Sequence, residues 1–91
     1  MKAEINVIHP IVHMNGTSAD ELIDLRSNAW DALRKALDML KRMAPNGRDY
    51  YPEPGRMDLA HEQHDRRLRT VCNLMNELEC EIDKMEYDRC S

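Results

Sequence analysis

The chain has 91 residues, a formal net charge of −4 at pH 7, 42% hydrophobic residues and 4% aromatic residues. This length allows one domain over 1–91, and so short a chain buries only about 60% of its unfolded surface, which makes an isolated monomer marginally stable. The acidic balance excludes general nucleic-acid binding, which requires a basic face. The lack of a signal peptide and of an apolar run of about 18 residues predicts a cytoplasmic protein without membrane contact.

The composition also favours self-association. Phe is absent, so seven Met and many Leu and Ala must supply the core. A small core of this kind is completed more easily by association than by folding alone, which predicts a homo-oligomer. The three Cys are odd in number and lack CxxC spacing, which is typical of reduced cytosolic thiols, and Cys72 is expected in the core.

The first predicted element is a short extended N-terminal arm over 1–14. Apolar and polar residues alternate over 3–7, a period typical of a strand. Pro10 restricts this segment to a sheet edge or to irregular structure. Because one strand cannot form a sheet by itself, the arm is expected to pair with a second copy or to lie along the helices.

The turn that follows the arm is a candidate binding site as well as a helix start. Helix-capping spacing occurs twice in overlapping registers, as Ser18 with Glu21 and as Thr17 with Asp20. The first amides of a helix lack partners within the helix and lie at the positive end of its dipole, so they can bind a phosphate or a carboxylate. The candidate ligands of such an anion are His13, Asn15, Gly16, Thr17 and Ser18. In the alternative interpretation the turn only caps the helix.

A long helix is predicted over 17–43, with two adjacent apolar stripes that form one wide face. Arg26 is the single interruption of the first stripe. The first stripe consists of Ile23, Trp30, Leu33, Leu37, Leu40 and Ala44, and the second of Leu22, Leu25, Ala29, Ala32, Ala36, Met39 and Met43. One face can pack on the second helix, and the small residues allow close approach of a further helix. Alternatively, both stripes serve one broad intramolecular core.

The connection over 44–56 is longer than two antiparallel helices need. Pro45 ends the first helix, and the Asn-Gly pair at 46–47 indicates a turn. Arg48 suits bidentate phosphate contacts, and the rings of Tyr50 and Tyr51 can stack on a base. The alternative is that both Tyr rings cover the open end of the hairpin. This loop and the turn before the first helix lie about 40 Å apart, so they can share a ligand only across a subunit boundary.

A second helix is predicted over 57–88, with a single heptad stripe made of His64, Leu68, Val71, Met75, Leu78, Ile82 and Met85. The predicted fold is therefore mostly α: an antiparallel helical hairpin with a short extended N-terminal arm, assembling into a homo-oligomeric helical bundle. The acidic end of this helix is expected to be a solvated face.

No pattern in the chain predicts catalysis, a metal or a cofactor. His61 and His64 are three residues apart, whereas the zinc-protease pattern requires four. The acidic residues near the C-terminus could suggest a carboxylate metal site like that of helical nucleotide pyrophosphatases. Their shared face lies off the core stripe, and the first helix offers only scattered acids. The chain is therefore expected not to be an enzyme.

Two motifs give the chain a resemblance to a group of small proteins encoded by tailed phages and prophages. They are His13-Met14-Asn15-Gly16-Thr17-Ser18 and Pro45-Asn46-Gly47-Arg48-Asp49-Tyr50-Tyr51-Pro52, in a match over roughly 5–85. The group has no assigned activity, so the resemblance implies a phage context and the host cytoplasm. It also implies the kinds of role that small phage proteins take, among them the sequestration of nucleotide immune signals by helical oligomers.

The sequence thus predicts a non-enzymatic, phage-type binding protein that captures a phosphorylated small molecule, such as a nucleotide immune signal, and so acts as an anti-defence sponge. The turn at 15–18 would hold phosphate with help from His13, while Arg48 and Tyr50 or Tyr51 would supply charge and stacking. The alternative is a structural or protein-binding helical hairpin that acts on a phage or host protein.

Overall fold

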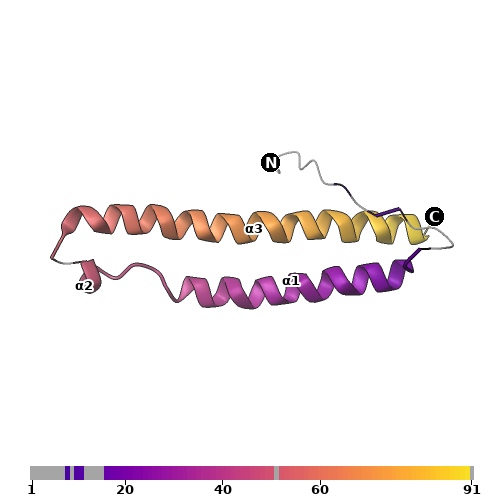
Figure 1. Ribbon diagram of the computed structural model, residues 1–91, viewed down its shortest axis with the longest axis horizontal. Coiled ribbons are helices and arrows are strands. Elements are labelled where there is room, and N and C mark those ends of the chain that lie inside the picture. Colours follow the sequence, from indigo (N-terminus) through magenta and orange to yellow (C-terminus); the bar gives the residue numbers. More distant parts are fainter. Residues whose placement is uncertain (1–7, 9, 12–15, 51, 91) are drawn as a thin grey trace.

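Two long helices lie antiparallel in the computed structural model, with one short helix near the turn between them (Figure 1). The structure describes residues 8, 10–11, 16–50 and 52–90. The helices are α1 (Ala19–Lys41), α2 (Gly47–Tyr50) and α3 (Pro54–Cys90), and the described residues contain no strand. The predicted mostly helical hairpin is confirmed. The molecule is elongated, with extents of 62 × 24 × 19 Å.

The expected N-terminal arm falls mainly outside the described residues. Of 1–14, only Ile8, Pro10 and Ile11 are described, and these three belong to no regular element. The side chains of Ile8 and Ile11 are exposed. Whether the arm pairs with a second copy therefore stays a prediction.

The end of α1 comes two residues before the predicted limit at 43. From Arg42 onward the amides bond to carbonyls three residues back, in Arg42 N to Met39 O at 3.1 Å and Met43 N to Leu40 O at 2.9 Å. Such tighter bonds satisfy carbonyls that the last helical turn leaves without partners. Pro45 then follows and cannot donate a further amide bond.

The connection predicted over 44–56 lies at 42–53 and is partly helical. Asn46 caps α2, because its side-chain oxygen accepts the Arg48 amide at 3.0 Å and its carbonyl accepts the Asp49 amide at 3.0 Å. The Asn-Gly pair therefore starts a helical turn. Likewise, α3 begins at Pro54, three residues before the predicted start at 57, in a position where proline is favoured.

The core lies along the contact between α1 and α3. Its buried apolar side chains in the described residues are Ile23, Leu37, Met75 and Met85, and Met85 is fully buried. His64 is buried on the same heptad stripe of α3, whose other members are half-buried. Cys72 lies just outside this stripe and is exposed, so its expected core position is wrong. A two-helix contact therefore yields a thin core for a chain of this length.

Within the described residues, no helix is both long enough and apolar enough to span a bilayer.

Candidate functional site

The start of α1 is capped by one of the two predicted registers. Ser18 is the N-cap: its hydroxyl accepts the Glu21 amide at 3.2 Å, and its carbonyl accepts the Leu22 amide at 3.0 Å. Gly16 forms a bend, and Gly16, Thr17 and Ser18 are all exposed. The Ser18 register is therefore the one used, and the capping role of the turn is confirmed without excluding a ligand.

The other predicted members of this turn, His13 and Asn15, lie outside the described residues. Their part in an anion site stays a prediction. The dipole of α1, with Asp20 and Glu21 in its first turn, already has negative charge near its positive end. These two carboxylates would repel an anion at Gly16 to Ser18 and would offset part of its attraction to the helix dipole.

The second predicted half of the site surrounds α2. Arg48 is exposed, and its amide is taken by the Asn46 side chain. Tyr50 is described only by its backbone, which ends α2, and Tyr51 lies outside the described residues. The stacking role of the two rings, and the alternative that they cover the hairpin end, both stay predictions.

A shallow, open hollow of about 280 Å³ lies beside α2. It is lined by Asp49, Pro52, Glu53 and Arg56. The Glu53 carboxylate pairs with the Arg56 guanidinium across one turn at the start of α3. Two carboxylates against one paired guanidinium make this hollow a poor anion site, and none of the predicted ligand-binding residues lines it.

The two predicted halves lie at opposite ends of the hairpin. Gly16 to Ser18 precede α1, whereas Arg48 lies beyond its C-terminus, next to the start of α3 (Figure 1). α1 alone is about 35 Å long at the standard helical rise. One chain therefore does not bring the two halves together on a small ligand, in agreement with the separation expected from sequence.

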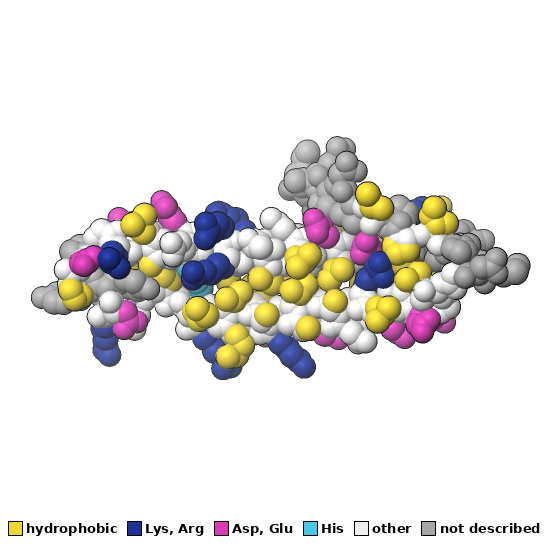
Figure 2. Space-filling model, viewed as in Figure 1, with side chains coloured by type: hydrophobic (Ala, Val, Ile, Leu, Met, Phe, Trp, Pro, Cys, Tyr) yellow, Lys and Arg dark blue, Asp and Glu magenta, His cyan; other side chains and the backbone are white. Residues whose placement is uncertain are grey.

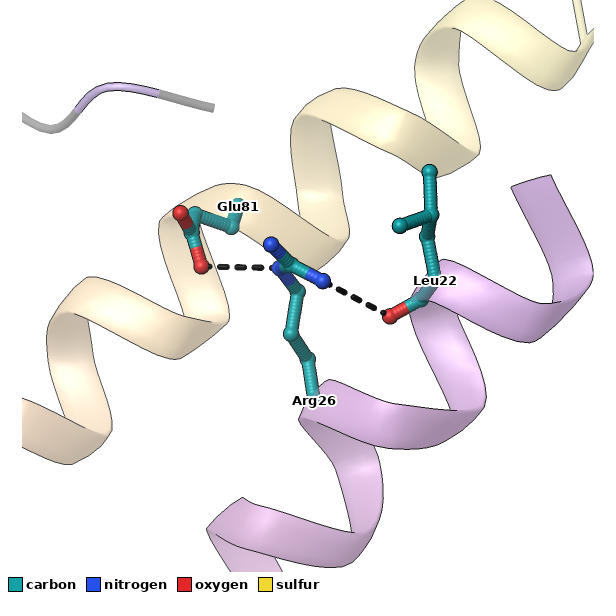
Figure 3. Close-up of polar contacts among 3 residues, drawn as sticks. All are labelled: Leu22, Arg26 and Glu81. Atoms are coloured by element: carbon teal, nitrogen blue, oxygen red, sulfur yellow. Dashed lines mark hydrogen bonds and ion pairs between the residues drawn. The ribbon is translucent and has the colours of Figure 1, made fainter. Parts of the chain in front are cut away.

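Polar residues that sequence reasoning did not assign join the two long helices. The Arg26 Nε donates to Glu81 Oε2 at 2.9 Å, and Arg26 Nη1 donates to the Leu22 carbonyl at 3.2 Å (Figure 3). The Trp30 indole N–H donates to Glu79 Oε1 at 3.1 Å. These contacts fix the register of α1 on α3. The available signal was the charged interruption at Arg26 in an apolar stripe, but the neighbouring acids of α3 left its partner undetermined.

The histidines and acids do not assemble into a metal site in the part of the chain that is described. No group of three His, Cys, Asp or Glu side chains is placed to hold a metal ion there. His64 is buried in the core and His61 is exposed, so the pair does not face a common point. Two of the acids near the C-terminus, Glu79 and Glu81, accept hydrogen bonds from α1.

An exposed apolar seam runs along α1. It follows the spacing of a coiled-coil stripe and lies beside the stripe that packs on α3. All six members are exposed, and yellow side chains run along α1 in Figure 2. We call it the α1 seam, and its members are Leu25, Ala29, Ala32, Ala36, Met39 and Met43. The alternative that both stripes serve one intramolecular core is therefore wrong for these six residues.

Charge is strongly segregated along the hairpin. The Arg26–Glu81 and Trp30–Glu79 contacts set 19–31 beside 77–89 and 32–43 beside 65–76. The first pair of segments, the acidic half, has ten Asp and Glu against three Lys and Arg, a net charge of −7. The second pair, the basic half, has seven Lys and Arg against two Asp, a net charge of +5. Dark blue side chains gather around the cyan histidine on the α2 side of Figure 2.

No family model, curated protein or solved structure matches the chain.

Proposed function

We propose that the protein is a non-enzymatic binding protein of phage type that captures a phosphorylated small molecule as a homo-oligomer. The observation that carries the proposal is the exposure of both motif-bearing segments at structured helix starts. Gly16, Thr17 and Ser18 precede the first amides of α1, and the exposed Arg48 lies in the capped helix α2. Backbone amides and a guanidinium are the donors that phosphate oxygens accept.

Oligomerisation is part of this proposal, because the two segments lie at opposite ends of one chain. A nucleotide held by both would need the start of α1 from one copy and α2 from another. Carboxylates lie beside each segment and repel an anion. We therefore expect stacking of the ligand on Tyr50 or Tyr51 to contribute to binding as well. The phage resemblance favours a nucleotide immune signal as that ligand, which would make the protein an anti-defence sponge.

A thermal-shift screen tests this function. The ligands are cyclic dinucleotides, cyclic trinucleotides and ADP-ribose isomers, each at a concentration series reaching about 100 times the expected Kd. A ligand that binds only the folded state adds about 2.7 kcal/mol at that excess, a shift of several degrees. No stabilisation by any of them would count against ligand capture.

Matched variants locate the binding. Arg48→Gln should abolish the ligand-induced shift and leave the melting temperature without ligand unchanged, because Arg48 is exposed. Arg67→Gln is the control, because it removes the same charge from an exposed position on α3. Gly16→Ala and Tyr51→Ala extend the test to the other predicted contacts. Equal loss of stability with and without ligand would favour a structural role for these residues.

The second candidate function is a helical hairpin that binds proteins. The exposed α1 seam favours it, because contiguous apolar surface on a small protein marks an interaction site. In that case the turn before α1 is only a cap. Capture of a phage or host partner that Ala32→Glu abolishes and Arg48→Gln leaves intact would support this function over ligand capture.

A further inference from the structure

We propose that the α1 seam is the contact surface for a second copy of this chain, packed antiparallel across a two-fold axis between Ala32 and Ala36. The inference rests on three observations: the unpartnered seam, its symmetric spacing and the segregated charge. The dimer itself does not depend on ligand binding. Only the inference that the dimer brings together the two predicted halves of the ligand site rests on the proposed function.

α1 is the helix that needs a further neighbour. One of its apolar stripes packs on α3, with Ile23 and Leu37 buried, while the α1 seam faces solvent. Leu25, Met39 and Met43 are between 58% and 61% exposed. α3 differs, because its heptad stripe is already used against α1 and its flanks are mainly polar. In an assembly, α1 therefore lies at the centre and α3 at the periphery.

The seam is symmetric under reversal. Its residue spacings read four, three, four, three, four in either direction. Reversal about the midpoint sets Ala32 against the second copy's Ala36 and Ala29 against its Met39. Small residues thereby meet at the centre, where the two helices approach closely, and each Met is placed opposite a small residue or Leu25. A parallel pair would instead set Ala on Ala and Met on Met, which leaves uneven gaps.

Charge selects the antiparallel orientation. Reversal places the acidic half of each copy, with net charge −7, beside the basic half of the other, with net charge +5. On the flank of the seam, Lys35 and the second copy's Asp31 then lie about 3 Å apart along the helix axis, as do Arg42 and the second copy's Asp24. A parallel pair would align like charges along its whole length. Complementary halves favour one orientation and suppress the other.

The antiparallel pair also joins the two predicted halves of the ligand site. Ser18 lies about 24 Å from the midpoint of the seam along the helix axis. The cross-helix contacts set that midpoint level with Leu74, so the start of α3 at Pro54 lies about 30 Å from it. α2 packs against α3 near this start. The α1 start of one copy and Arg48 of the other therefore lie at the same end of the dimer.

Sedimentation equilibrium of the full chain tests the association. We expect twice the 10.7 kDa chain mass, and a rise of about 100-fold or more in the dimer dissociation constant for Ala32→Glu. Asn73→Glu is the control, because it adds the same charge at an exposed position of α3 outside the seam and should leave the mass unchanged. A monomeric native chain, or an Ala32→Glu dimer of unchanged affinity, would overturn the proposal in favour of another occupant, such as the chain's own arm.

Disulfide trapping tests the orientation even if Ala32→Glu fails to fold. In a chain with C72S, C80A and C90S, the variants Ala29→Cys and Met39→Cys are oxidised separately and as a mixture. The antiparallel register predicts a covalent dimer mainly in the mixture, because identical positions lie about 15 Å apart along the axis. Covalent dimers from each variant alone, and none enriched in the mixture, would overturn the antiparallel arrangement. Loss of ligand stabilisation with the dimer intact would instead count only against the proposed function.

Discussion

The ion pair between Arg26 and Glu81 gives the sharpest prediction about stability. The two side chains are 21% and 14% exposed, and the Arg26 Nε lies 2.9 Å from Glu81 Oε2. Exposed ion pairs contribute about 0.2–1 kcal/mol, and hydrogen bonds to charged groups contribute about 1.5–3 kcal/mol. A partly buried pair with good geometry should therefore show a coupling free energy of about 1–1.5 kcal/mol.

The single variant Glu81→Ala should cost more than the coupling alone. It leaves the Arg26 guanidinium with only the Leu22 carbonyl as a described partner in a half-buried position. We expect a loss of about 2 kcal/mol in the free energy of unfolding, equivalent to roughly 8–16 °C for a domain of this size. Arg26→Ala and the double variant complete the cycle.

The assay is urea unfolding followed by far-UV circular dichroism. The chain concentration is fixed, because self-association would make stability depend on it. The control cycle uses Arg34 and Asp38, whose side chains are 57% and 58% exposed and whose closest charged atoms are 3.8 Å apart. Its coupling should stay below about 0.5 kcal/mol. Equal coupling in the two cycles would refute the role assigned to the Arg26–Glu81 contact in holding the helices in register.

Three further substitutions test the packing and the capping. Met85→Ala should lower the free energy of unfolding by about 2–5 kcal/mol, because Met85 is fully buried, and Met85→Leu should recover most of that loss in the same urea titration. Ser18→Ala should cost about 1 kcal/mol because it removes the acceptor of the Glu21 amide, while Ser18→Asp should restore the cap; equal stability of all three chains would contradict the assignment. Trp30→Phe should cost about 1–2 kcal/mol because Glu79 loses the indole donor, and a neutral result in thermal unfolding would show that water replaces it without loss.

The sequence was sufficient for the hairpin because its apolar periodicity is strong. Ile23 and Leu37 are buried on the predicted first stripe, and Met75 and Met85 are buried on the predicted stripe of the second helix. The helix limits were less accurate for local reasons. The sequence pattern places Pro54 in the connection, although proline is well suited to the first turn of a helix. The Asn-Gly pattern predicts a turn at Asn46, whereas the side chain of Asn46 caps α2.

The polar contacts between the helices were beyond sequence reasoning. Arg26 could be recognised as a charge in an apolar stripe, but its partner depends on the relative rotation and register of two helices. Glu77, Glu79, Glu81 and Asp83 were equivalent candidates by spacing. The structure selects Glu81 for Arg26 and Glu79 for Trp30.

The candidate site was only partly accessible to sequence reasoning. Spacing and composition predict its two segments, which stay predictions, and helix length correctly predicts that they lie far apart in one chain. The sequence did not reveal which surface of α1 stays exposed, because that depends on how much of its wide apolar face is covered by α3. The structure answers it at Ala29, Ala32 and Ala36, which stay exposed.

The distance between spin labels at position 24 in two copies tests the antiparallel seam most directly. Asp24 is exposed and lies on the flank of the seam, so Asp24→Cys in the chain with C72S, C80A and C90S carries the label outside the six apolar residues of the seam and removes one of the flanking charges. Reversal about the midpoint predicts an axial separation of about 30 Å in pulsed dipolar spectroscopy. A separation under about 15 Å would show a parallel pair, and the absence of dipolar coupling would show that α1 does not pair with a second copy.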